Sequence, residues 1–307
     1  MFSFYYLKIQ VITIISNSVG EKIIIGNNFK IFDAHLHTYG IFLNQNESIL
    51  SYMDRFFVEK AIITTINRTK YYKKQKEVVS EINKGNKITQ FKENFRDLMN
   101  HGQLDHTDVK KIVDKAPERF YKFFWFNPNM DAEEEESDYK ILEEHFKEGF
   151  CGVKIHSGFH RISIPKDVNK LVSFMQEYDR NLILYIHSLP KTAFFSGIST
   201  SDIAKLAKKF PNLRIIVGHA ANTMSYAIEV GMMLNYKNIY FETSCSVSFG
   251  IYNLIKTIGH EKILFGSDSP TASTLPIEID KIITLPRISK KVKQDILYNN
   301  VNNLLKG

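Results

Sequence analysis

The sequence has few of the features that mark secreted, membrane-spanning or nucleotide-binding proteins. Only two of its 307 residues are cysteines, Cys151 and Cys245. They exclude a disulfide framework and favour a reducing, cytoplasmic setting. No apolar run reaches the ~20 residues that a membrane-spanning helix needs, so we expect no membrane partner. No Gly-x-Gly-x-x-Gly follows the first expected strand, which argues against the alternative of an open, doubly wound sheet.

The first 28 residues are interpreted as an N-terminal extension. The opening stretch, MFSFYYLKIQVITIIS, is apolar, but it has no basic start, Lys8 interrupts it, and no clear cleavage site follows. We therefore favour a segment packed on the domain over a targeting signal. At most a short hairpin is expected there, from residues 11–16 and 22–26.

The chain is basic, with a formal net charge of +7 and a pI of about 9.1. Basic charge can indicate nucleic-acid binding. Here the lysines are scattered, with only short clusters at residues 71–76 and 289–293. We interpret these clusters as solvated helix faces and expect no nucleic-acid partner. A small-molecule substrate and a homo-oligomer are both compatible with the sequence.

Eight short segments rich in β-branched and aromatic residues recur along the chain. Most are continuously apolar, as strands buried on both faces should be. They span residues 29–35, 59–66, 119–126, 151–156, 181–187, 213–219, 238–243 and 262–268. Helical patterns separate them, for example at residues 137–150, 167–180 and 200–210, the last with Thr200 or Ser201 as its expected cap.

This alternation predicts an α/β fold, a (β/α)8 TIM barrel that occupies residues 1–307 as a single domain. From the third strand onward the units repeat at the length of a βα unit. The exception is the polar, helix-patterned stretch of residues 67–118. We predict that it is a helical insertion between strands 2 and 3 that covers the barrel mouth.

Histidines concentrate where the predicted strands end. His35, His37, His156, His187 and His219 lie at or just past strand ends, and Asp268 lies just beyond the eighth strand. In a barrel these strand ends meet at one face, which is where active sites form. The chemistry is therefore expected at this face.

His35 and His37 are two residues apart, so both side chains point to the same side of an extended strand. Such a pair can bind one ion, with His187 and Asp268 adding ligands from across the barrel. Imidazoles and a carboxylate suit one divalent metal ion: Zn²⁺ is favoured, with Mn²⁺, Fe²⁺ or Ni²⁺ as alternatives.

Four motifs at these positions resemble the amidohydrolase superfamily: DAHLH (33–37), YIHS (185–188), VGHA (217–220) and ILFGSDSP (263–270). The likeness is to the group of aminocarboxymuconate-semialdehyde decarboxylase and related metal-dependent TIM-barrel hydrolases, and it runs from about residue 29 to 306. It implies that His35, His37 and His187 are metal ligands. It also implies that Asp268 is a ligand or a proton acceptor and that His219 orients or deprotonates a metal-bound water.

Lys154 leaves alternatives open. It shares a side of the fourth strand with His156, and binuclear members of the superfamily carry a carboxylated lysine on that strand. Lys154 could therefore bridge a second, less expected ion, or remain an ammonium that pairs with a substrate carboxylate or with a barrel acid. His156 faces the substrate or has a structural role.

Other polar residues give weaker signals. His160 and Arg161 follow the fourth strand and are candidates for binding an anionic substrate. Glu242 on the seventh strand is expected to need a buried partner such as Lys154. Asp33 is expected to support the histidines of the first strand.

Several functions fit this set of residues. The favoured one is a metal-dependent hydrolase that uses a metal-activated water on a carbonyl, amide or ester. The alternatives are a nonoxidative decarboxylase of a small carboxylic acid, a metal-dependent phosphoesterase and a non-enzymatic binding protein. A decarboxylase needs a basic group for the carboxylate, and Lys154 and Arg161 are candidates. A structural ion would need no open mouth, which argues against the non-enzymatic alternative.

Overall fold

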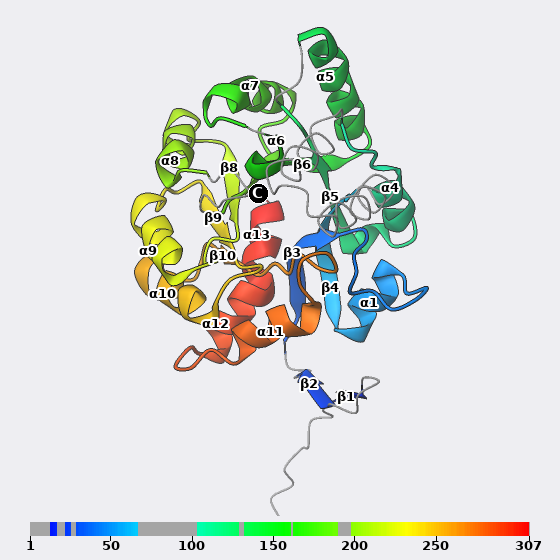
Figure 1. Ribbon diagram of the computed structural model, residues 1–307, viewed down its shortest axis with the longest axis vertical. Coiled ribbons are helices and arrows are strands. Elements are labelled where there is room, and N and C mark those ends of the chain that lie inside the picture. Colours follow the sequence, from blue (N-terminus) through cyan, green and yellow to red (C-terminus); the bar gives the residue numbers. More distant parts are fainter. Residues whose placement is uncertain are drawn as a thin grey trace, which may run out of the picture.

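Eight parallel strands form the centre of the protein in the computed structural model (Figure 1). The structure describes residues 13–16, 22–25, 29–66, 103–128, 132–160, 162–189 and 198–306. The strands are β3 (Ile31–His37), β4 (Val58–Thr64), β5 (Phe120–Trp125), β6 (Phe150–His156), β7 (Ile183–His187), β8 (Arg214–Gly218), β9 (Ile239–Glu242) and β10 (Ile263–Leu264). Each pairs with the next along the chain, which confirms the predicted α/β barrel.

The sheet closes between its first and last strands. Ala34 N donates to the Phe265 carbonyl at 2.8 Å, and Asp268 N donates to the His35 carbonyl at 2.8 Å. The eighth strand was predicted to span residues 262–268, but β10 ends at Leu264. Beyond it the backbone bonds to β3 without a regular ladder, which places Asp268 beside the histidines of β3.

Most of the helices surround the strands as an outer layer (Figure 1). The helices of the described residues are α1 (Ile49–Arg55), α4 (Thr107–Val113), α5 (Ala132–Lys147), α6 (Ser157–His160), α7 (Asn169–Tyr178), α8 (Thr200–Lys209), α9 (Met224–Met233), α10 (Ser248–Ile258), α11 (Leu275–Ile283), α12 (Lys290–Gln294) and α13 (Asn300–Lys306). A π-helical turn, Asp295–Asn299, joins α12 to α13.

Helix α8 shows how the outer layer forms. Its buried residues include Ile203, Leu206 and Ala207, at the spacing of one helical face. The side chain of Ser199 accepts a hydrogen bond from Ser201 N at 3.2 Å and caps the helix. Ser199 is therefore the N-cap, and the prediction of Thr200 or Ser201 was wrong by one or two residues. The extended backbone that an N-cap requires occurs at Ser199.

The barrel interior is filled and closed at its base. Phe32, Ile62 and Phe123 pack inside the barrel against Val301 and Leu304 of α13. Figure 1 shows α13 at the centre of the ring of strands. Because α13 covers the end where the strands begin, the mouth of the barrel lies at the opposite end, where they finish.

Two predicted segments fall partly outside the described residues. Of the expected insertion, residues 67–102 lie outside them, while residues 103–118 contain α4 and the start of a short 3₁₀ turn, Pro117–Arg119. The helical insertion stays a prediction. In the N-terminal extension, β1 (Thr13–Ser16) and β2 (Lys22–Ile25) pair antiparallel, which confirms the expected short hairpin.

None of the helices in the described part of the chain combines the length and the apolar character that crossing a bilayer requires.

Candidate metal centre at the barrel mouth

Three candidate ligands converge at the mouth of the barrel. The Nε2 atom of His35 lies 3.4 Å from Asp268 Oδ1, and Nε2 of His37 lies 3.0 Å from the same oxygen. A tetrahedral ion with bonds of about 2.0–2.3 Å holds its ligand atoms roughly 3.3–3.8 Å apart. This donor set of His35, His37 and Asp268 therefore has nearly the spacing that a divalent ion requires. Both imidazoles face Asp268, in agreement with their two-residue spacing on one strand, and their role as metal ligands stays a prediction.

The amine of Lys154 lies at the same convergence point. Its Nζ atom is 2.5 Å from His35 Nε2 and 3.1 Å from His37 Nε2. The ammonium also lies 4.7 Å from the ring centre of Trp125 and 5.2 Å from that of Tyr185. The amine thus lies beside both histidine nitrogens of the set.

Hydrogen bonds on the far side of His35 determine which of its nitrogens carries the proton. Its Nδ1 atom lies 2.8 Å from Tyr185 Oη and 3.1 Å from Ser244 Oγ. Both hydroxyls donate to Glu242 Oε2, at 2.7 and 2.8 Å, so each can only accept from His35. We infer that Nδ1 carries the proton, which leaves the Nε2 lone pair directed at Asp268 and Lys154.

Glu242 is the common acceptor of this buried network. Besides Tyr185 and Ser244, the backbone N–H of His219 donates to its Oε2 at 3.2 Å. The partner of Glu242 was expected to be Lys154, but the structure shows the hydroxyls in that place, because Lys154 points past Glu242 to the histidines. The Glu242 carboxylate thus lies on the Nδ1 side of His35, and it already accepts hydrogen bonds from these donors.

Two glycines make room for this network. A Cβ atom on Gly218 would lie 2.1 Å from Tyr185 Oη, and one on Gly266 would lie 2.1 Å from Glu242 Oε1. Both distances are far below any van der Waals contact. Only glycine at these positions allows the Tyr185–Glu242 pair to occupy the barrel interior.

His219 and His187 form a second pair of imidazoles. The Nδ1 atom of His219 donates to the Ser244 carbonyl at 3.0 Å, so its Nε2 atom carries a lone pair. That Nε2 lies 3.0 Å from His187 Nδ1, which must therefore be the donor. This tautomer leaves His187 Nε2 free of a proton, as a metal ligand requires. Its role as fourth ligand stays a prediction, since its Nδ1 faces His219.

Burial sets the protonation states of the cluster. It lowers the pKa of His35, His37 and His187 below the usual value. The next cause is the charge of Lys154 for His35 and His37, and the neighbouring imidazoles for His187. Burial opposes ionisation of Asp268, but its contacts with the surrounding imidazoles outweigh that effect and lower its pKa. Neutral imidazoles beside a carboxylate are the protonation states that bind divalent ions.

Burial also lowers the pKa of Lys154 to about 8, although the charges of Asp268 and Glu242 oppose that change. At neutral pH the amine therefore carries a proton more often than not, and it loses that proton more readily than an exposed lysine.

The ends of β8, β9 and β10 have unusual backbone geometry. His219, Cys245 and Asp268 all have positive φ angles, of 57°, 53° and 54°. Residues other than glycine rarely adopt this left-handed conformation, which costs about 1–3 kcal/mol each. The three side chains are turned toward one another at the mouth by this geometry.

Two further aspartates hold the strand ends that carry the histidines. Asp33 Oδ1 accepts from the backbone N–H of His35 and of Ser267, at 2.9 Å each. Asp108, at the start of α4, accepts from the hydroxyls of Thr38 and Thr65, which follow β3 and β4. The expected supporting role of Asp33 agrees with its contacts, and Asp108 is a support that the sequence did not reveal.

A cavity of about 170 Å³ opens beside the donor set. His37, Lys154, His156, His187 and Asp268 contribute to its lining, together with residues that include Trp125 and Phe159. The ring of His156 stacks on His187 at 3.5 Å and on Phe159 at 3.7 Å between ring centres, and it lies 4° from parallel with Trp125. A flat aromatic wall therefore faces the candidate ligands.

The other predicted binding residues have different outcomes. His156 and Lys154 both line the cavity from β6, and the role of His156 at the substrate stays a prediction. His160 is 2% exposed, and its imidazole hydrogen-bonds the backbone of Phe126, so it has a structural contact of its own. Arg161 lies outside the described residues, and its role stays a prediction.

The sequence interpretation missed Tyr185 and Cys245. Tyr185 could have been found, because it precedes His187 by two residues on β7 and so faces the same side. Cys245 carried no signal, since its position depends on the left-handed turn after β9.

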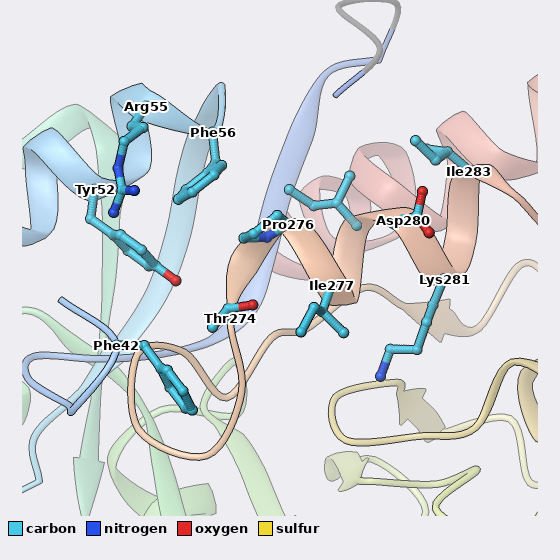
Figure 2. Close-up of a pocket in the computed structure, with 11 residues that line it drawn as sticks. Phe42, Tyr52, Arg55, Phe56, Thr274, Pro276, Ile277, Asp280, Lys281 and Ile283 are labelled. Carbon is cyan, nitrogen blue, oxygen red and sulfur yellow. The ribbon is translucent and has the colours of Figure 1, made fainter. Parts of the chain in front are cut away.

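A larger cavity, of about 570 Å³, lies outside the barrel between α1 and α11 (Figure 2). Figure 2 shows Phe42, Tyr52 and Phe56 on one side and Pro276 and Ile277 on the other. Its lining contains no histidine and no cysteine. The chemistry therefore concentrates in the smaller cavity at the mouth.

Comparison with solved structures finds the same fold. One structure, of a 2,6-dihydroxybenzoate decarboxylase bound to 2,6-dihydroxybenzoate, has a TM-score of 0.58 at 14% identity and covers 91% of this chain and 98% of its own. A dihydroxybenzoic acid decarboxylase from Polaromonas sp. with bound manganese has a TM-score of 0.57 at 18% identity, with coverages of 92% and 97%. A probable 2-pyrone-4,6-dicarboxylic acid hydrolase from Acinetobacter baumannii has a TM-score of 0.59 at 12% identity, with coverages of 91% and 100%.

Among curated proteins, no sequence matches the chain. The sequence model of the amidohydrolase family matches residues 32–306, which include all eight barrel strands except the first residue of β3. The match also contains every residue of the donor set described above. The protein is therefore a member of the amidohydrolase family.

Proposed function

We propose that the protein is a metal-dependent hydrolase that acts on a carbonyl, amide or ester of a small molecule. The observation that carries this proposal is the convergence of His35 Nε2, His37 Nε2 and Asp268 Oδ1 beside a cavity. Two of these atoms, on His35 and Asp268, are acceptors 3.4 Å apart, and such a pair needs a cation between them. A divalent ion held there would polarise a substrate carbonyl and lower the pKa of a bound water to about 7.

The remaining groups are positioned for proton transfer. His219 Nε2 has a lone pair and lies 3.8 Å from Asp268 Oδ2, so it can accept a proton at the edge of the donor set. This nitrogen accepts a hydrogen bond from His187 Nδ1, which holds the ring in place and must break before His219 takes up a proton. Asp268 thus serves as ligand through one oxygen and faces the proton acceptor with the other.

Lys154 must move when an ion binds. Its Nζ lies only 2.5 Å from His35 Nε2, so the ammonium and an ion compete for the same acceptors. The side chain also lines the cavity, so a displaced ammonium stays within reach of a bound substrate. A carboxylated Lys154 that bridges two ions remains the alternative.

The same position of Lys154 supports decarboxylation as the second candidate function. An ammonium in the cavity can pair with a substrate carboxylate, and the stacked wall of Trp125, Phe159 and His156 suits a flat ring. Two of the similar structures carry the names of aromatic acid decarboxylases. The comparisons give no support to the phosphoesterase alternative.

The proposal also includes the identity of the metal ion and the cellular compartment of the protein. Two imidazoles and one carboxylate favour Zn²⁺, while the manganese in one similar structure keeps Mn²⁺ as an alternative. Both cysteines are free thiols, in agreement with a reducing, cytoplasmic setting.

Elemental analysis of protein purified without chelators tests the metal site. We expect about one tightly held divalent ion per chain in the wild type and no tightly held ion in the His35→Ala, His37→Ala double variant. The matched control is His145→Ala, His260→Ala, which removes two histidines outside the mouth and should retain the ion. Metal-free wild-type protein that binds no added Zn²⁺ or Mn²⁺ would refute the proposal.

A substrate screen then separates the two candidate reactions. The metal-loaded protein is incubated with lactones, esters, amides and aromatic carboxylic acids, and both acid release and CO₂ release are measured. Hydrolysis without CO₂ supports the first function, and CO₂ release from a carboxylic acid supports the second.

A further inference from the structure

The two oxygens of Asp268 face different sets of donor atoms. Oδ1 faces the imidazoles of His35 and His37, as described above. Oδ2 faces His219 Nε2 at 3.8 Å and Cys245 Sγ at 3.7 Å. The candidate ligand atoms of His219, Cys245 and Asp268 all lie within 4.8 Å of one another.

The structure assigns His219, Cys245 and Asp268 as a second metal site, which takes a thiophilic divalent ion such as Zn²⁺ or Cd²⁺ and shares the Asp268 carboxylate with the first site. Asp268 Oδ2 lies 3.7 Å from Cys245 Sγ and 3.8 Å from His219 Nε2, which agrees with the roughly 3.3–3.8 Å between the ligand atoms of a tetrahedral ion. One thiol, one imidazole and one carboxylate favour Zn²⁺ and softer ions over Mn²⁺.

An ion bound at His219 Nε2 replaces a single hydrogen bond, the one that this nitrogen accepts from His187 Nδ1. Because Nδ1 of His219 donates to the Ser244 carbonyl, the Nε2 lone pair points toward Asp268 and His187. The Cys245 thiol donates weakly to Asp268 Oδ2, so a bound ion replaces the thiol proton between sulfur and oxygen. Cys245 binds as the thiolate and releases one proton.

A third group of nearby donors, His35, His219 and Glu242, does not form a comparable site. Glu242 already accepts hydrogen bonds from Tyr185, Ser244 and the backbone of His219. An ion there would have to displace these donors. The accessible second set is therefore the one that contains Cys245.

Occupation of the second site affects the reaction. His219 Nε2 is the proton acceptor of the proposed hydrolase, and an ion bound there removes its lone pair from use. A thiophilic ion in excess is therefore inhibitory, a consequence that rests on the proposed function. Binding of the ion to the second site is independent of that function.

The test is a titration of the metal-free, full-length chain with Cd²⁺, followed by absorption of the thiolate-to-metal charge-transfer band. We expect two bound equivalents and a band in the wild type. Because the chain has only two cysteines, Cys245→Ser should lose the band and one equivalent, while the matched control Cys151→Ser keeps both. Titration with Mn²⁺ should give one equivalent.

The outcomes separate this inference from the proposed function. One equivalent without a band overturns the second site and leaves the first intact. One equivalent with a band that depends on Cys245 supports the second site and contradicts the first. A band of the same strength in Cys245→Ser overturns the assignment.

Labelling of the wild type decides the question if Cys245→Ser does not fold. The rate of alkylation of the Cys245 peptide, followed by mass spectrometry, should fall at least tenfold when Cd²⁺ is added beyond one equivalent, since a metal-bound thiolate is shielded. An unchanged rate at Cys245 with two ions bound overturns the assignment.

Discussion

Replacing Tyr185 by phenylalanine tests whether the network behind His35 controls metal binding. The hydroxyl lies 2.8 Å from His35 Nδ1 and donates to Glu242 at 2.7 Å. Its loss leaves a buried carboxylate with one donor fewer and weakens the constraint on the tautomer of His35. The metal-free variant should therefore lose about 1–3 kcal/mol of unfolding free energy.

The effect on metal affinity follows from the same contacts. Removing an outer hydrogen-bond partner of a metal ligand typically lowers the affinity about 10–100-fold. Ser244 Oγ remains 3.1 Å from His35 Nδ1 and keeps a second acceptor in place. We therefore expect the lower end of that range, roughly tenfold, which corresponds to about 1.4 kcal/mol.

Competition with a chromophoric chelator measures the dissociation constant for Zn²⁺, and urea unfolding measures stability. The matched control is Tyr52→Phe, since the Tyr52 hydroxyl is also buried and accepts from Leu275 N at 3.0 Å, outside the metal centre. It should lose similar stability without loss of affinity. A dissociation constant for Tyr185→Phe equal to that of the wild type would refute the tautomer argument.

Three other predictions follow from the same structure. Asp268→Asn should keep the fold but lose turnover and most Zn²⁺ affinity, and full activity toward any substrate found in the screen would contradict this. Burial lowers the pKa of His106 and His160 to about 3. As the pH falls below about 6.5, these two histidines therefore gain protons in the unfolded chain but not yet in the folded protein. The unfolding free energy of metal-free protein should then fall by up to about 1.4 kcal/mol per pH unit for each group until the pH approaches 3, and His106→Gln should reduce this slope in urea titrations at several pH values. Gly218→Ala would place a Cβ atom 2.1 Å from Tyr185 Oη, so we expect a loss of several kcal/mol in unfolding free energy and weaker Zn²⁺ binding, and a variant as stable as the wild type would rule out the close approach.

The barrel could be predicted because its strands are buried on both faces and therefore read as continuous apolar segments. All eight appear in the structure close to their expected positions. The eighth was overestimated, because residues 265–268 continue β10 but bond to β3 through an irregular closure rather than a regular ladder. Closure joins residues more than 200 positions apart, and no local pattern encodes it.

The donor set could be predicted in part. The spacing of His35 and His37 fixes their common direction, and the strand ends bring Asp268 and His219 to the same face. The hydrogen bonds among Tyr185, Ser244 and Glu242 were harder to predict. They depend on how the residues of three different strands align with one another across the barrel. The sequence thus indicated which groups within one strand or at strand ends lie close together, but it did not indicate the contacts across strands, and the roles of these groups stay predictions.

The helix α13 that closes the barrel base has a consequence for biosynthesis. Val301 and Leu304 pack against side chains of β3, β4 and β5, which are synthesised some 180 to 270 residues earlier. Until residues 300–306 leave the ribosome, the apolar interior at the base has no cover, and the strands that line it remain open to water and to other nascent chains. The last seven residues of the described chain therefore complete the burial of a core that begins with its first barrel strand.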